Sequence, residues 1–338
     1  MLELHNRTSF PIAIVPALDK EGRDYAVVVV KGTYDLRGDL STTPVSEVQV
    51  PILLGDVFHG EPGKSSVKYE SDTCLRKRGT DIVLLGHAYT RGNRRTSVDV
   101  TVQSGRLART VRVFGDRHWY KSPMGWAISP PEPFVKIPLV YERAFGGGEM
   151  TDPPREGGPY EPRNPVGTGY SFAGRKEHLE GLPVPNLEHP GFLISDWKDK
   201  PPPAGFGFIG RSWTPRREYA GTYDAAWEKD RMPLLPADFD ERYFNGAPAE
   251  LVSDRHFAGG EPVRILNASA AGELAFHLPT FRAEITASIR GKPADHPAVL
   301  DTVVVEPDEG RILLTWRATI PCHRSFLAVD WVRVRETA

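Results

Sequence analysis

Val98-Asp99-Val100-Thr101-Val102-Gln103 decides the fold class of this chain. Its valines alternate with polar residues, so the valines share one face of an extended segment and the polar side chains share the other. Ser104-Gly105 follows, and residues 107–114 again gather aliphatic side chains on one face. The pattern predicts a half-buried antiparallel hairpin, with residues 81–90 as its neighbouring strand.

Strand-like runs occupy both ends of the chain. Residues 25–140 have the pattern of antiparallel sheet, and Pro307-Asp308-Glu309-Gly310 marks a turn between later strands. The later runs are 263–266, 274–278, 283–289, 300–305, 312–320 and 326–334. A short helix is expected over residues 224–231, ending before Pro233. We therefore predict a mainly β fold with antiparallel sheets in two sandwich- or barrel-like regions and few short helices.

The middle of the chain differs in composition. It contains Gly146-Gly147-Gly148, Pro201-Pro202-Pro203 and several tryptophans, which favour ordered turns over regular ladders. We predict an N-terminal β region at 1–142, a Gly/Pro/aromatic-rich loop region at 143–250 and a C-terminal β region at 251–338. Loops packed over both sheets would instead join the two β regions into one intertwined domain.

Charge and cysteine content limit the possible partners. The 338 residues include 42 Lys plus Arg and 44 Asp plus Glu, for a formal net charge of -2. This balance provides no overall field for nucleic acid, and no apolar run is long enough to insert into a membrane. Cys74 and Cys322 form no disulfide framework, and the first residues lack a signal-peptide pattern, so we expect a cytoplasmic protein.

Motifs for cofactors and metals are weak. Gly205-x-Gly207-x-x-Gly210 matches the dinucleotide fingerprint, but prolines precede it where a strand is required and Trp213-Thr214-Pro215 follows where a helix should begin. The ten histidines are scattered without zinc-site spacing. We expect no cofactor and no metal.

Asp238, Asp240 and Glu241 form the best carboxylate cluster. Two such groups beside aromatic platforms could serve a carbohydrate-binding or glycoside-hydrolysing protein. The favoured interpretation is that they accept hydrogen bonds from turn amides or pair with nearby arginines, which orders the loops without chemistry.

The same stretch is rich in the residue types that dominate protein interfaces. Its candidate partner-binding residues are Trp213, Arg216, Tyr219, Tyr223 and Trp227. Some of these side chains would pack the loops internally, and the others would form an exposed anchor cluster.

Several segments carry a family resemblance. They are Gly115 to Trp119, Tyr141 to Gly147, Asn164 to Tyr170, Leu182 to Glu188, Pro203 to Gly207, Ala220 to Asp224, Pro236 to Asp240 and Tyr243 to Pro248. Over nearly its whole length the chain resembles the bacterial domain-of-unknown-function family twenty-one sixty-nine. The motif residues are Arg143, Phe145, Gly146, Gly147, Asn164, Pro165, Gly167, Gly205, Gly207, Asp224, Asp238 and Asp240.

The resemblance implies an adaptor, or effector chaperone, of type VI secretion systems. Such a protein binds a toxic effector in the bacterial cytoplasm and helps load it onto the VgrG or PAAR spike protein. The resemblance carries over no catalytic residue, so the chain is expected not to be an enzyme. A sugar-directed β protein using Asp238, Asp240 or Glu241 is the alternative.

Overall fold

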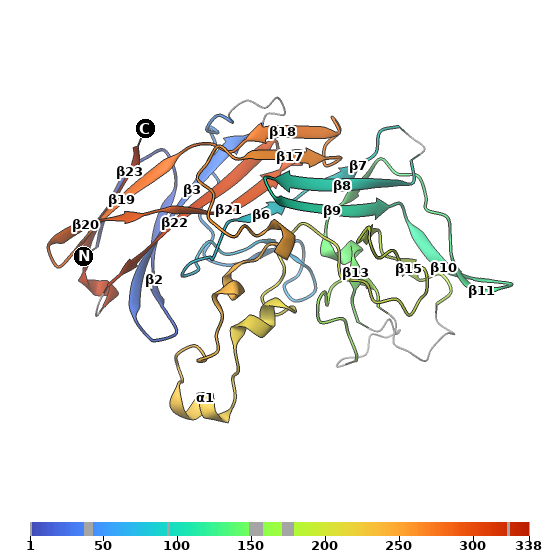
Figure 1. Ribbon diagram of the computed structural model, residues 1–338, viewed down its shortest axis with the longest axis horizontal. Coiled ribbons are helices and arrows are strands. Elements are labelled where there is room, and N and C mark those ends of the chain that lie inside the picture. The colour runs from blue at the N-terminus through green and yellow to red at the C-terminus, as the bar shows by residue number, and fades with distance from the viewer. Residues whose placement is uncertain are drawn as a thin grey trace.

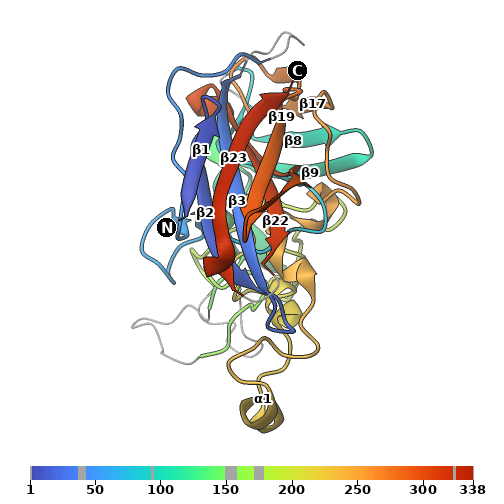
Figure 2. The ribbon, with the colours of Figure 1, turned by 90° about the vertical axis from the view of Figure 1, so that its left-hand side faces the viewer.

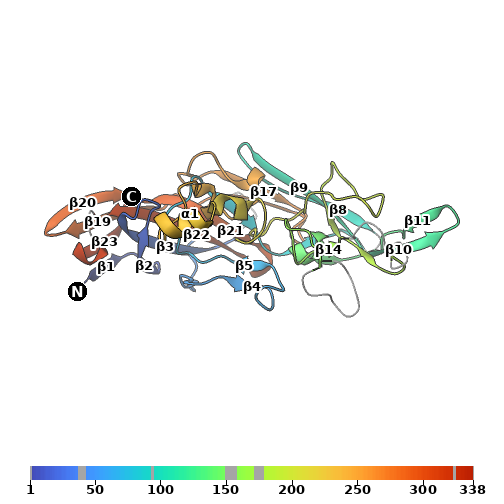
Figure 3. The same cartoon turned by 90° about the horizontal axis from the view of Figure 1, so that it is seen from below.

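The computed structural model describes residues 2–36, 43–92, 95–148, 158–170, 179–322 and 325–337. Strands dominate these residues and helices are few and short, which confirms the mainly β prediction. The molecule is elongated, with the chain termini near one end and the β10–β11 hairpin at the other (Figures 1 and 3).

The central sheet has the strand order β2-β3-β22-β21-β6. Its strands are β2 (Ile12–Leu18), β3 (Asp24–Asp35), β22 (Arg311–Pro321), β21 (Val299–Glu306) and β6 (Asp81–Leu84). β3 pairs with β22 along the whole length of β22, and β6 runs parallel to β21. Residues 26–30 of β3 are buried on both faces, which explains why they read as a continuous aliphatic run without alternation.

A second sheet faces the central one. Its order is β1-β23-β19-β20, formed by β1 (Glu3–Arg7), β23 (Val329–Thr337), β19 (Arg282–Ile289) and β20 (Lys292–Pro297). Figure 2 shows the two sheets as stacked layers. Phe10, Phe281 and Trp316 meet between them, with the rings of Phe10 and Phe281 edge to face at 4.8 Å. This half of the molecule is therefore a sandwich.

The predicted hairpin lies in a third sheet. Its order is β16-β9-β8-β17-β18, formed by β16 (Leu187–Glu188), β9 (Leu107–Phe114), β8 (Ser97–Ser104), β17 (Pro262–Leu266) and β18 (Glu273–His277). β8 pairs with β9 as expected, and its valines are buried. The prediction that residues 81–90 neighbour this hairpin is wrong, because β17 takes that position and β6 joins the central sheet.

Shorter elements complete the chain. The small strands are β4 (Val57–Phe58), β5 (Val67–Tyr69), β7 (His87–Tyr89), β10 (Arg117–Ser122), β11 (Gly125–Ile128), β12 (Lys136–Pro138), β13 (Phe145–Gly146), β14 (Thr168–Gly169) and β15 (Pro183–Val184). The 3-10 helices are Tyr141–Arg143, Arg216–Ala220, Glu241–Phe244, Ala249–Leu251, Pro307–Glu309 and Phe326–Ala328. Among the described residues, the α-helix is α1 (Ala225–Asp230), inside the range predicted for it.

Strands from the two ends of the sequence pair with each other in the same sheets. β3 pairs with β22 in the central sheet, and β8 pairs with β17 in the third. One large hydrophobic core accordingly contains side chains from both ends of the chain and from the middle region, among them Phe206 and Phe208. The middle region is thus packed onto the sheets.

A layer of buried ionic groups lies on the central sheet beneath residues 70–81. Lys31 Nζ donates to Asp72 Oδ2 at 2.8 Å, and Lys77 Nζ donates to Asp81 Oδ2 at 2.7 Å. Arg317 pairs with Asp301, and both side chains are almost wholly buried. Burial opposes the charged form of Lys77, but the carboxylates of Asp81, Asp301 and Glu70 together outweigh it and raise the Lys77 pKa. These pairs fix residues 70–81 to the sheet.

Asp301→Asn removes the counter-charge of Arg317 without changing the side-chain shape. It should lower the free energy of unfolding by about 3 kcal/mol or more, because an uncompensated charge stays buried. Denaturant unfolding measures this change. Arg264→Ala is the control, since it breaks an exposed pair with Glu273, and it should change stability little. Equal effects of the two substitutions would contradict the role assigned to the buried pair.

Candidate functional site: an arm and the pocket at its base

The most prominent feature of the middle region is a projection formed by residues 221–240, which we call the arm. It extends away from all three large sheets and carries α1 at its far end (Figures 1 and 2). Asp224 caps α1 by accepting a hydrogen bond from the Trp227 amide at 2.8 Å. No residue of α1 is buried. A helix of this length gains its order from side-chain contacts within the arm rather than from a core.

Side-chain hydrogen bonds hold the arm in shape. Trp227 Nε1 donates to the Leu234 carbonyl at 2.8 Å, and the Tyr223 ring lies edge-on to the Trp227 ring at 4.7 Å. Arg231 donates to the Lys20 carbonyl in the turn between β2 and β3. The arm is therefore braced against the central sheet at a turn that is 211 residues away in sequence.

Three of the five candidate partner-binding residues lie at the surface. Tyr223 is 54% exposed, and Trp227 and Tyr219 are half-buried. Met232, which the sequence reasoning did not select, is 61% exposed on the same arm. Together Tyr223, Trp227 and Met232 give the arm an apolar surface for contact with another molecule.

Trp213 and Arg216 are placed in the interior instead. Trp213 is 6% exposed and packs edge-on to Tyr141, with ring centroids 5.4 Å apart. Arg216 is 4% exposed, pairs with Glu70 at 2.5 Å and donates to the Ile209 and Tyr243 carbonyls. Both side chains order the loops at the base of the arm, so we leave them out of the contact surface.

The three carboxylates of the candidate cluster each hold a local structure. Asp238 accepts from the Thr222 amide and hydroxyl, and these two bonds lower its pKa. Asp240 pairs with Arg242 at 2.7 Å, which lowers the Asp240 pKa, and it caps the 3-10 helix that follows. Glu241 pairs with Arg76 at 2.7 Å. A glycosidase acid needs a raised pKa, whereas the pKa values of Asp238 and Asp240 are lowered; together with the Glu241–Arg76 pair, these contacts favour the interpretation that the three groups order the loops.

The motif segments before the arm converge on one buried asparagine. Asn164 Nδ2 donates to the Tyr141 carbonyl at 2.8 Å and to the Phe145 carbonyl at 3.0 Å. Gly147 donates its amide to the Asn164 carbonyl at 2.8 Å, while Gly146 lies in the parallel pair of β13 and β14. These bonds fold two separate motif segments, which also contain Pro165, into one compact unit.

Close packing explains two of the motif glycines. A Cβ on Gly167 would lie 2.3 Å from Asn164 Nδ2 and 2.7 Å from the Ala144 carbonyl oxygen. A Cβ on Gly205 would lie 2.7 Å from the Tyr141 ring, whereas one on Gly207 would meet only ordinary contacts. Residues 203–210 contain neither strand nor helix, which agrees with the rejection of a dinucleotide fingerprint there.

Two further motif segments meet at Arg143. Its Nη1 donates to Asn186 Oδ1 at 2.9 Å and to Asp116 Oδ1 at 3.3 Å. Asn186 in turn donates to the Phe114 carbonyl at 3.0 Å. These motif residues therefore stabilise the fold of the middle region and attach it to the third sheet.

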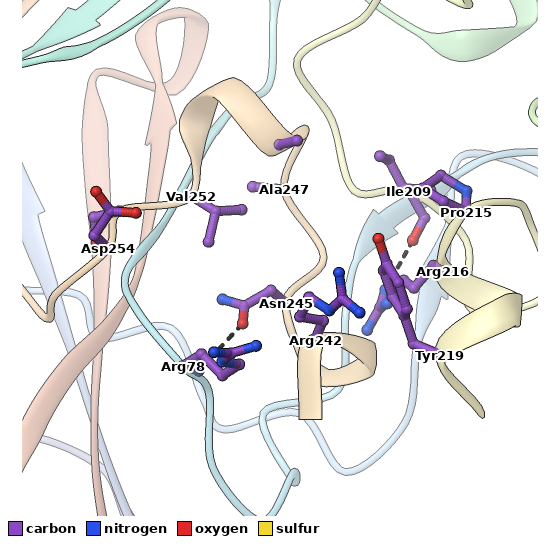
Figure 4. A pocket seen from close by; sticks show the side chains of 12 residues that line it. Arg78, Ile209, Pro215, Arg216, Tyr219, Arg242, Asn245, Ala247, Val252 and Asp254 are labelled. Carbon is purple, nitrogen blue, oxygen red and sulfur yellow. Dashed lines mark hydrogen bonds between the residues drawn. The ribbon is translucent and has the colours of Figure 1, made fainter. Parts of the chain in front are cut away.

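A pocket of about 440 Å³ opens at the base of the arm (Figure 4). Its polar lining comes from Arg78, Arg242, Asn245 and Ser253, and Asp254 lies across the pocket from Tyr219. Its apolar lining consists of Ile209, Pro215, Ala247, Ala249 and Val252, with Tyr219 beside them. The Arg242 guanidinium stacks on the Tyr219 ring at 4.3 Å. The pocket thus combines cationic and apolar walls, as ligand sites commonly do.

Sequence reasoning missed most of this pocket. Arg78 lies just before β6 in the N-terminal part of the chain, whereas Arg242 and Val252 belong to the end of the middle region. Only the tertiary fold brings them together. Met232 carried a weak local signal, because it opens the apolar run Met232-Pro233-Leu234-Leu235 in an otherwise polar segment.

Other kinds of site find little support. The described residues contain no group of three or more His, Cys, Asp or Glu side chains arranged to hold a metal ion. In the described part of the chain, no helix has the length and apolarity needed to cross a membrane. Burial raises the pKa of the Cys74 thiol, which keeps it protonated and unreactive.

Comparison with known proteins identifies the family. Residues 21–317 match the family described as "Uncharacterized protein conserved in bacteria (DUF2169)", and the chain belongs to this family. The match includes the motif segments, the arm and the pocket. No curated protein matches the chain, and no solved structure matches it.

Gly167→Ala tests the role of the motif glycines. The added methyl group collides with backbone atoms and with Asn164, so we expect a loss of about 1 to 3 kcal/mol in the free energy of unfolding. Thermal or denaturant unfolding measures this loss. Gly55→Ala is the matched control, because a Cβ there meets nothing within 4 Å. Unchanged stability of Gly167→Ala would show that the motif glycine is not needed for packing.

Proposed function

We propose that this protein is an adaptor, or effector chaperone, of a type VI secretion system, and that the arm is its main contact surface for the toxic effector. The observation that carries the proposal is the exposure of Tyr223 and Met232 on a projection that is ordered yet contributes little to the core. An adaptor needs such a surface, since it must hold a partner without chemistry and later release it.

The construction of the arm supports this role. A projecting surface whose shape is fixed before binding loses little entropy when a partner docks. Trp227 is held by its bond to the Leu234 carbonyl, and Arg231 ties the arm to the Lys20 carbonyl. The exposed aromatic and methionine side chains are types enriched at interfaces. An interface of about 1,600 Å² is of standard size, and we expect the complex with the effector to bury an area of that order.

The adaptor role itself is what the resemblance of the motif segments implies. The partners on this proposal are a toxic effector and a PAAR or VgrG spike protein, met in the bacterial cytoplasm. The proposal assigns no catalytic residue. The carboxylates Asp238, Asp240 and Glu241 keep the loop-ordering contacts described above.

Affinity purification from the native bacterium, followed by mass spectrometry, tests the role of the arm. The tagged protein should recover a toxic effector and a spike protein. Tyr223→Ala and Met232→Ala should each reduce recovery of the effector, because truncating an exposed interface anchor costs about 1 to 3 kcal/mol of binding free energy. Both variants should keep the unfolding midpoint of the parent protein.

Leu327→Ala is the matched control. Leu327 is 89% exposed but lies in the 3-10 helix Phe326–Ala328, outside residues 221–240 of the arm. Its recovery of partners should equal that of the parent protein. Full recovery by the two arm variants, or purification of the protein alone while the secretion system is expressed, would refute the proposal.

A further inference from the structure

The pocket at the base of the arm has an uneven distribution of positive charge. Arg242 is engaged by Asp240 at 2.7 Å, whereas Arg78 Nη1 lies 3.9 Å from the same carboxylate. The longer distance exceeds a hydrogen bond, so Asp240 does not hold the Arg78 guanidinium, which can donate to a ligand. Both arginine side chains are more than half exposed. The pocket therefore offers a forked cation at its rim.

The charge at the arginine rim of the pocket favours a ligand with one negative charge. Arg78 and Arg242 together with Asp240 carry one net positive charge, since two cations face one carboxylate. The third arginine of the lining, Arg216, is neutralised by Glu70 at 2.5 Å. Asp254 also lines the pocket, across from Tyr219 (Figure 4), and its negative charge disfavours a dianion there. A carboxylate fits this field better than a phosphate does.

The apolar wall adds a second requirement. Ile209, Ala247 and Val252 line the pocket beside the arginines, and the cavity of about 440 Å³ has room for an aliphatic side chain. A ligand that carries a carboxylate and an apolar group on the same carbon could contact the arginines with the first and the apolar lining with the second. The last residue of a polypeptide has this composition, because its side chain and its terminal carboxylate share one Cα.

We infer that the pocket binds the C-terminal residue of a partner polypeptide, with the terminal carboxylate at Arg78 and Arg242 and an apolar side chain against Val252. Bidentate hydrogen bonding from a guanidinium suits a carboxylate. Asn245 holds the Arg78 backbone amide at 3.2 Å and so positions this residue at the rim. The inference rests on the proposed function, because the proposed function provides the protein partner whose C-terminus would enter the pocket while the arm contacts the same partner.

Titration of the full-length protein with synthetic peptides tests the inference without the native partner. The probes are an N-acetylated pentapeptide ending in leucine with a free carboxylate, its C-terminally amidated twin, an amidated pentapeptide ending in glutamate, and inorganic phosphate. The free-carboxylate peptide should bind at least tenfold more tightly than each of the other three. Calorimetry or NMR chemical-shift titration gives the Kd.

Substitutions locate the binding site. Arg78→Ala should raise the Kd of the free-carboxylate peptide about tenfold and abolish its advantage over the amidated twin. Arg264→Ala, which removes an arginine of similar exposure on the third sheet, should leave the Kd unchanged. Circular dichroism shows whether each variant is folded.

Three outcomes would overturn the inference: no binding of the free-carboxylate peptide, equal binding of its amidated twin, or tighter binding of phosphate or of the glutamate peptide. Each would remove the pocket as a C-terminus site while leaving the arm's role to the purification experiment. Conversely, selective peptide binding would support the pocket as a C-terminus site even if the arm variants recovered every partner. A failure of the inference about the pocket can therefore be distinguished from a failure of the proposed role of the arm.

Discussion

The pairing of β3 with β22 is the constraint on which the rest of the structure depends. These strands come from opposite ends of the sequence and pair over all 11 residues of β22. One face of the pair contributes to the main core, and Tyr25, Val27 and Val29 on the other face pack under Leu75 and Phe244. The pairing closes a loop of nearly 300 residues, an entropic cost that is offset by extensive apolar burial.

The buried ionic layer connects that sheet to the candidate site. Asp81, which pairs with Lys77, also accepts from the Gly246 amide at 2.9 Å and from Asn245 Nδ2 at 2.8 Å. Asn245 then contacts Arg78 at the rim of the pocket. A continuous set of hydrogen bonds, buried at Lys77 and Gly246 and exposed at Arg78, thus runs from the sheet to the base of the arm, and it supports the contact surface as a preorganised binding site requires.

The sequence allowed the local elements to be predicted but not their partners. The valine alternation at 98–102 indicated a half-buried strand, and residues 224–231 ahead of Pro233 indicated a short helix, because both signals depend on neighbours in sequence. The parallel pairing of β6 with β21 and the burial of Trp213 depend on contacts between distant residues. For the same reason the aromatic content suggested a contact surface but did not show that Trp213 is buried and Tyr223 exposed. The exposure of each side chain is set by its tertiary contacts.

Hydrogen exchange compared between the free protein and the complex that it forms with its co-purified partner tests the central claim most directly. If the arm and the pocket form the contact surface, amides within residues 221–240 and 242–254 gain protection in the complex, while the sheet cores exchange as before. Protection confined to another surface, such as the β10–β11 hairpin, with the arm unchanged, would contradict the account.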